Sequence, residues 1–111
     1  MAIYANINID QGSDFLSVIT VEDTAGNVVN LTGYTAAGQV RKTYASNTIS
    51  ATFGASITQP TLGKISLTLP ASATNNMKAG RYVYDVEITS SGGTVSRVIE
   101  GQVEVMPGVT R

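Results

Sequence analysis

Two carboxylates on one predicted strand are the side chains in this sequence best placed for acid–base chemistry. Asp85 and Glu87 alternate with apolar residues, so both lie on the same face of the strand, about 7 Å apart. Carboxylate pairs at such a separation serve in glycoside hydrolysis. An outward-facing polar row, with Arg97 or Arg81 as an ion-pair partner, explains the same pattern without further assumption, and we favour that interpretation.

The composition removes the commonest catalytic groups. The 111 residues include no His and no Cys, so the usual general bases, thiol nucleophiles and transition-metal ligands are absent. Four side chains could be considered as oxygen ligands for calcium, namely Asp10, Asp14, Asp23 and Asn27. Their spacing is not that of an EF-hand loop, and residues of these types are typical of turns. We therefore predict no catalytic residue, no metal site and no cofactor, and a protein that is not an enzyme.

Charge is also scarce. Only 14% of the residues are charged and the formal net charge is −1. The basic residues form no stripe interleaved with aromatic ones, so binding to nucleic acid or to an anionic membrane is not expected. The sequence has no stretch long enough to span a membrane and no signal peptide, which predicts a product made in the cytoplasm. A weakly charged surface suits a protein that packs against identical or partner subunits.

The elements that position these side chains are predicted most plainly in residues 63–108. Alternating apolar residues predict one strand over Lys64–Leu69 and another over Tyr82–Ile88. Ser90–Gly93 predicts a tight turn, after which Val95–Val105 returns as an antiparallel neighbour. The predicted inward face of the middle strand carries Tyr82, Tyr84, Val86 and Ile88.

A tyrosine corner is predicted where that middle strand begins. Tyr82 follows Gly80 by two residues and comes just after a crossover, which is where Ig-like sandwiches place a tyrosine whose hydroxyl bonds to backbone upstream. The alternative is that Tyr82 is an ordinary large core residue. Both interpretations make its role structural. The preceding segment, Pro70–Ala79, can hold one short helical turn, with Gly80 where a C-terminal cap belongs.

The other predicted strands are less regular. Alternation predicts a first strand over about residues 2–9, and small residues in a strand over about Thr35–Lys42 indicate the close approach of another segment. Residues 43–61 carry only weak strand signals. Their best stretches are Thr48–Phe53 and Ala55–Thr58.

A strand over Phe15–Glu22 has apolar residues on both faces, with Leu16 and Val18 opposite Phe15, a pattern suited to the middle of a sheet.

The whole chain therefore predicts one all-β domain over residues 1–111. The expected fold is an Ig-like β-sandwich of about seven or eight antiparallel strands, with at most one short helical turn. A small barrel is the second choice.

Several segments, taken in chain order, resemble a known family. They are Asp10–Phe15, Asp23–Asn27, Leu31–Thr35, Leu67–Pro70, Ala79–Val86 and Gly93–Gly101. Together they look like the small Ig-like virion proteins of tailed bacteriophages, and the likeness extends to the N-terminal attachment domain of upper baseplate proteins. It covers nearly the whole chain, with the elements in the same order. No stalk, coil or receptor-binding domain follows Arg111 in this sequence, so direct receptor binding is not expected.

The resemblance implies a structural protein of the virion, made in the host cytoplasm. It would be an assembly or adaptor module of the tail or baseplate, or a decoration (cement) protein of the capsid, with other virion proteins as partners and a homo-oligomer in the particle. The segments expected to make contacts are Ile3–Ile9, Tyr44–Thr61 and Met106–Arg111. Within and beside them, the candidate interface residues are Ile3, Tyr4, Ile7, Tyr44, Phe53, Met106 and Val109.

A carbohydrate-binding β-sandwich module is the alternative function. Such modules usually display exposed aromatic side chains on a sheet or loop. Trp is absent here, which leaves Tyr4, Tyr34 and Tyr44 as the platforms on which a glycan could stack.

Overall fold

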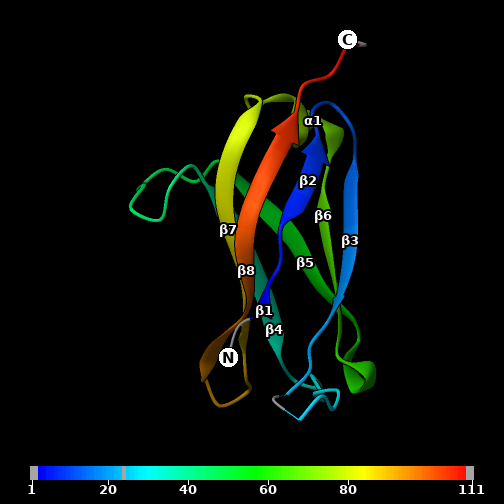
Figure 1. Ribbon diagram of the computed structural model, residues 1–111. Helices are drawn as coiled ribbons and strands as arrows, with labels where there is room; N and C mark the ends of the chain where they lie inside the picture. The colour runs from blue at the N-terminus through cyan, green and yellow to red at the C-terminus, as the bar shows by residue number, and fades with distance from the viewer. Residues whose placement is uncertain (1–2, 24, 110–111) are drawn as a thin grey trace.

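In the part of the chain that the structure describes, eight strands form a sandwich of two layers, which confirms the predicted Ig-like all-β class (Figure 1). The structure, a computed structural model, describes residues 3–23 and 25–109. The strands are β1 (Ile3–Tyr4), β2 (Ile7–Asp10), β3 (Phe15–Thr20), β4 (Thr35–Arg41), β5 (Ala51–Gln59), β6 (Lys64–Leu69), β7 (Gly80–Thr89) and β8 (Val95–Met106). A 3-10 turn, η1 (Pro60–Leu62), follows β5, and the predicted helical turn is α1 (Ala71–Asn75). No helix in the described residues is long and apolar enough to cross a membrane.

The strand order is β1-β8-β7-β4-β5-β6-β3, with β2 also pairing with β8. Strand β5 changes layers, because Ala51–Phe53 pairs with β4 and the segment from Gly54 onward pairs with β6. One layer therefore contains β4, β7 and β8, and the other contains β3, β6 and β5, the grouping of an Ig fold. The expectation of purely antiparallel strands was wrong at one edge, where β1 and β2 run parallel to β8.

The core lies between the two layers and is built from the alternating residues of their inner faces. In β6 and β7 every residue predicted to face inward is buried, namely Ile65, Leu67, Leu69, Tyr82, Tyr84, Val86 and Ile88. The weakly patterned segment also enters the core through β5, where Phe53 is only 4% exposed. The prediction that Phe53 is an interface residue was therefore wrong.

Gly38 explains how the Phe53 ring reaches the core. A Cβ atom at Gly38 would lie 3.1 Å from Cδ2 of Phe53, so the missing side chain makes room for the ring. The ring also packs 5.9 Å from that of Phe15 and 6.1 Å from that of Tyr84, between centroids. The close approach predicted from the small residues of β4 is thus confirmed.

The predicted first strand is broken in two by a close backbone contact with β8. Between β1 and β2, Ala5 passes over Gly101 of β8, and a Cβ atom at Gly101 would lie 2.7 Å from the carbonyl carbon of Ala5. The contact is held by hydrogen bonds: Ala5 N donates to Glu100 O at 2.8 Å, Tyr84 Oη to Ala5 O at 2.6 Å, and Gln102 N to Asn6 Oδ1 at 3.2 Å.

Strand β3 lies at one end of the strand order, contrary to the expectation of a central strand. Its outer face carries Leu16 and Val18, which are 67% and 56% exposed. The two-sided apolar pattern thus reflects one buried face and one apolar face in contact with solvent.

The connection from β6 to β7 crosses between the layers through α1. The helix ends at Asn75 with Asn76 as its C-terminal cap, so Gly80 is not the cap; Gly80 instead begins β7 with a φ of 144°. Thr74, fully buried, ties the helix to the β2–β3 turn, because its Oγ1 donates to Ser13 O at 2.7 Å and accepts from Gly12 N at 3.1 Å.

Tyr82 has the hydrogen bond that a tyrosine corner requires, from its hydroxyl to Lys78 O at 2.7 Å. We expect Tyr82→Phe to lower the free energy of unfolding by about 1 kcal/mol, because the bond is lost and a carbonyl loses its partner. Urea unfolding measures this, with Tyr44→Phe as the control because Tyr44 is exposed. Equal stability of the two variants would show that the Tyr82 hydroxyl contributes nothing.

Candidate binding surfaces

A polar groove of about 240 Å³ lies on the outer face of β4, β7 and β8. One wall comes from the loop between β4 and β5, which projects from the sandwich (Figure 1). Its lining residues are Gln39, Arg41, Thr43, Tyr44, Val83, Tyr84, Asp85, Glu87 and Arg97. This set combines two guanidinium groups, two carboxylates, an amide and an exposed aromatic ring.

Arg41 holds the projecting loop against the sheet. Its Nη1 donates to Ser46 O at 2.9 Å, and its Nη2 donates to Oε1 of Gln39 at 3.1 Å. Because both bonds come from one rigid guanidinium fork, the loop and the sheet share a fixed anchor. Tyr44, three residues further on and 68% exposed, is thereby placed beside the groove.

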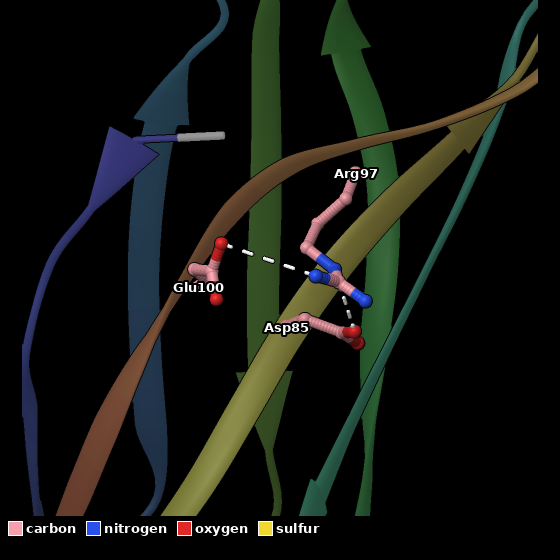
Figure 2. Close-up of polar contacts among 3 residues, drawn as sticks. All are labelled: Asp85, Arg97 and Glu100. Carbon is pink, nitrogen blue, oxygen red and sulfur yellow. Dashed lines mark hydrogen bonds and ion pairs between the residues drawn. The ribbon is translucent and has the colours of Figure 1, made fainter. Parts of the chain in front are cut away.

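An ion-pair cluster of Asp85, Arg97 and Glu100 (Figure 2) contributes two of its members, Asp85 and Arg97, to the lining of the groove. Nε of Arg97 lies 3.1 Å from Oδ2 of Asp85, and Nη1 of Arg97 lies 3.9 Å from Oε2 of Glu100. All three side chains are partly exposed, and surface ion pairs contribute only about 0–1 kcal/mol each. The cluster can therefore exchange internal contacts for contacts with a ligand at little cost in stability.

Asp85 and Glu87 occupy the outward row that the strand pattern favoured, and Arg97 is the partner of Asp85. The carboxylate pair is therefore placed at the open groove with one member already engaged by a guanidinium. Among the described residues, no group of three or more His, Cys, Asp or Glu side chains is arranged to hold a metal ion.

Tyr84 reaches from β7 into the core, and its burial, together with the nearby Tyr4, raises its pKa to about 12. The folded state thus disfavours the phenolate, and this contribution to stability is complete below the unfolded pKa of about 10 and is lost as pH rises from about 10 to 12. We expect stability to fall by about 1 kcal/mol more in the native protein than in Tyr84→Phe between pH 9 and about pH 11. Urea titrations across this range measure the difference, and parallel curves would contradict it.

The other candidate interface residues are mostly accessible. Ile3 and Tyr4 on β1, Met106 at the end of β8, and Val109 are exposed, whereas Ile7 is half-buried against the core. The last two residues of the predicted contact segment Met106–Arg111 lie outside the described residues.

Sequence analysis missed two residues of the accessible surface, Leu16 and Val18. Alternation marks both faces of their strand as apolar but cannot say which face a second layer covers. The informative signal was the polar sequence of the neighbouring strand, since the outward positions of β6 opposite them are Thr68 and Ser66.

The three tyrosines considered as glycan platforms lie in different surroundings. Tyr34 packs against the core and Tyr4 lies on β1 at the sheet edge. Tyr44 lines the polar groove. An aromatic ring beside a few convergent polar groups is the usual composition of a small-ligand site.

Comparisons with known proteins identify the fold. No protein-family description matches the sequence, and no curated protein matches it. Among solved structures, the chain is similar to CopC from Methylosinus trichosporium OB3b, with a TM-score of 0.53, 14% identity, and coverage of 96% of this chain and 89% of that one. It is also similar to a chain from the structural study of T cell specificity and activation by the bacterial superantigen toxic shock syndrome toxin-1, with a TM-score of 0.50, 17% identity, and coverage of 91% and 92%.

A third similar structure is the Lin-41 filamin domain, with a TM-score of 0.48, 14% identity, and coverage of 91% of this chain and 84% of that one. At identities this low the likeness to CopC and to the chain of the superantigen study concerns the fold alone. The strand order and these comparisons together make the chain an Ig-like β-sandwich domain.

Proposed function

We propose that this chain is a non-enzymatic assembly module, a structural protein that joins the parts of a larger particle through the edges of its sheets. The observation that carries the proposal lies at the two ends of the strand order. Both end strands, β1 and β3, display large apolar side chains to solvent: Ile3 and Tyr4 on one, Leu16 and Val18 on the other.

Such edges are suited to association. An end strand offers unpaired N–H and C=O groups to an incoming strand, and adjacent apolar side chains add burial. Within the described residues, no strand pairs with the outer side of either end strand. Contacts of this kind need little charge, in keeping with a chain in which only 14% of the residues are charged.

The resemblance to small Ig-like virion proteins of tailed bacteriophages gives the assembly role a setting. The proposed partners are other virion proteins, in the tail, in the baseplate or on the capsid shell, with the chain itself located in the virion. To test the partner class, tagged chain is incubated with separated heads and tails of the phage that encodes it. Retention on one component supports the role, and failure to bind either component counts against it.

A second candidate function, carbohydrate binding, rests on the groove beside Tyr44. A sugar ring could stack on this exposed side chain while its hydroxyls bond to Gln39, Arg41 and the Arg97–Asp85 pair. Neutral sugars would suit the groove, because its two guanidinium groups are balanced by two carboxylates.

A glycan array with the native protein and Tyr44→Ala tests this candidate. Binding that Tyr44→Ala weakens by at least about tenfold would support it, as expected for the loss of a stacking ring. Tyr4→Ala is the matched control, since Tyr4 is also largely exposed but does not line the groove. An array without any bound glycan, or equal losses in the two variants, would rule it out.

A further inference from the structure

We infer that β3 is the surface through which two copies of this chain associate, by antiparallel pairing of β3 with β3 of the second copy across a two-fold axis. This inference deepens the proposed assembly role by naming one partner and one edge. The β3–β3 pairing would join two three-stranded layers into one continuous sheet, β5-β6-β3-β3-β6-β5, while the β4–β7–β8 layers stay outside the contact.

The backbone of β3 is oriented for this pairing. Val21 N donates to Gly63 O at 2.8 Å, in the same register as the β3–β6 pairs. Because hydrogen-bonded and non-bonded pairs alternate along an antiparallel ladder, Phe15, Ser17 and Ile19 direct their main-chain groups toward β6. The main-chain groups of the intervening residues, Leu16, Val18 and Thr20, therefore point to the open edge.

This edge lacks the features that normally prevent strand addition. Proteins protect unused edges with charged residues, prolines, bulges or interruptions. Residues Phe15–Thr20 contain no charge and no proline, and their six pairs with β6 run without a register shift. The opposite edge of the strand order differs, because it is interrupted between β1 and β2 and carries Asp10.

The occupant that fits best is a second copy of the same edge. In a two-fold arrangement centred on Val18, Val18 faces its own counterpart and Leu16 faces Thr20, so outward-pointing main-chain groups meet throughout. No charges meet within Phe15–Thr20, while the flanking carboxylates Asp14 and Glu22 come opposite each other just beyond the two ends of the strand. The exposed apolar side chains Leu16 and Val18 of both copies then lie on one face, each beside cross-strand neighbours.

The rest of that face is compatible with the contact. Its outward residues on the neighbouring strands are small and uncharged, chiefly Ser56, Ser66 and Thr68, apart from Lys64. The Lys64 ammonium is engaged locally, since its Nζ donates to Oγ1 of Thr20 at 2.8 Å. Because one strand pair is a small contact, we expect a dimer of modest affinity, strengthened in a particle by high local concentration.

Light scattering of the purified chain over a dilution series tests the inference. The native protein is expected to form dimers that dissociate on dilution. Val18→Lys and Val18→Glu are each expected to weaken dimerisation by at least about tenfold, because the two-fold axis brings like charges together. Mixing the two variants is expected to restore dimers, since opposite charges then face each other.

Ser56→Lys is the matched control, because it adds the same charge to the same face two strands away from the edge. It is expected to dimerise like the native protein, and circular dichroism checks that all variants are folded. A monomeric native chain at every concentration, or dimers unaffected by the Val18 variants, would overturn the inference. So would a failure of the mixed variants to associate.

These outcomes are separable from those of the assembly proposal. A native chain that is monomeric yet retained on heads or tails would refute the β3 dimer and leave the assembly role standing. A β3 dimer that binds neither component would do the reverse.

Discussion

Phe53→Ala is expected to lower the free energy of unfolding by about 3–5 kcal/mol, the usual cost of removing a buried aromatic ring. The ring is 4% exposed and fills the space between the rings of Phe15 and Tyr84 over Gly38. Its removal leaves a cavity that the surrounding strands of both layers can fill only in part. Chemical denaturation monitored by circular dichroism measures the loss.

Tyr44→Ala is the matched control for this prediction. Tyr44 lies in the same weakly patterned segment but is 68% exposed, so its truncation is expected to change stability by no more than about 0.5 kcal/mol. If both variants retained native stability, the placement of Phe53 in the core would be wrong. The residue would then return to the set of candidate contacts.

Gly101→Ala is expected to destabilise the protein by about 2–3 kcal/mol, because the added Cβ would overlap the backbone of Ala5, which cannot move aside like a flexible side chain. The strain should concentrate at the contact of Ala5, between β1 and β2, with Gly101. Hydrogen exchange is the most specific measurement, since the amide of Ala5, which donates to Glu100 O, should lose protection.

Gly92→Ala controls for the general effect of replacing a glycine. A Cβ atom at Gly92 would have its nearest neighbour, Oγ of Ser90, at 3.9 Å, an ordinary contact. Its stability should stay within about 0.5 kcal/mol of the native value. A Gly101→Ala variant with native stability and a protected Ala5 amide would show that β1 and β2 are not bound over Gly101.

The fold class was predictable because the most regular strands alternate in step with their burial. In β6 and β7 the inward-facing apolar residues recur at every second position, and two of them, Leu67 and Val86, are fully buried. Residues 51–59 resisted prediction because β5 changes layers partway along, so its two halves pair with different strands. The break between β1 and β2 was also hidden, because it depends on a close backbone contact between Ala5 and Gly101 that no local pattern records.

The candidate surfaces were predictable only in part. The outward row at Asp85 and Glu87 follows from strand periodicity, and Arg97 was foreseen as a partner. Tyr44 lies beside this row because Arg41 anchors the loop that carries it. The sequence pattern of the loop does not set the path of the loop, so this placement could not be predicted. The edge position of β3 likewise depends on the first strands pairing with β8 rather than with β3, a choice that the alternation of apolar residues does not encode.

The measurement that tests the central proposal most directly is quantitative mass spectrometry of gradient-purified phage particles, intact and separated into heads and tails. An assembly module of the virion should be present in many copies, at a fixed ratio to one major structural protein, and should stay with either the head or the tail fraction. Absence of the chain from purified particles, or a content that falls steadily with each round of purification, would contradict the proposal.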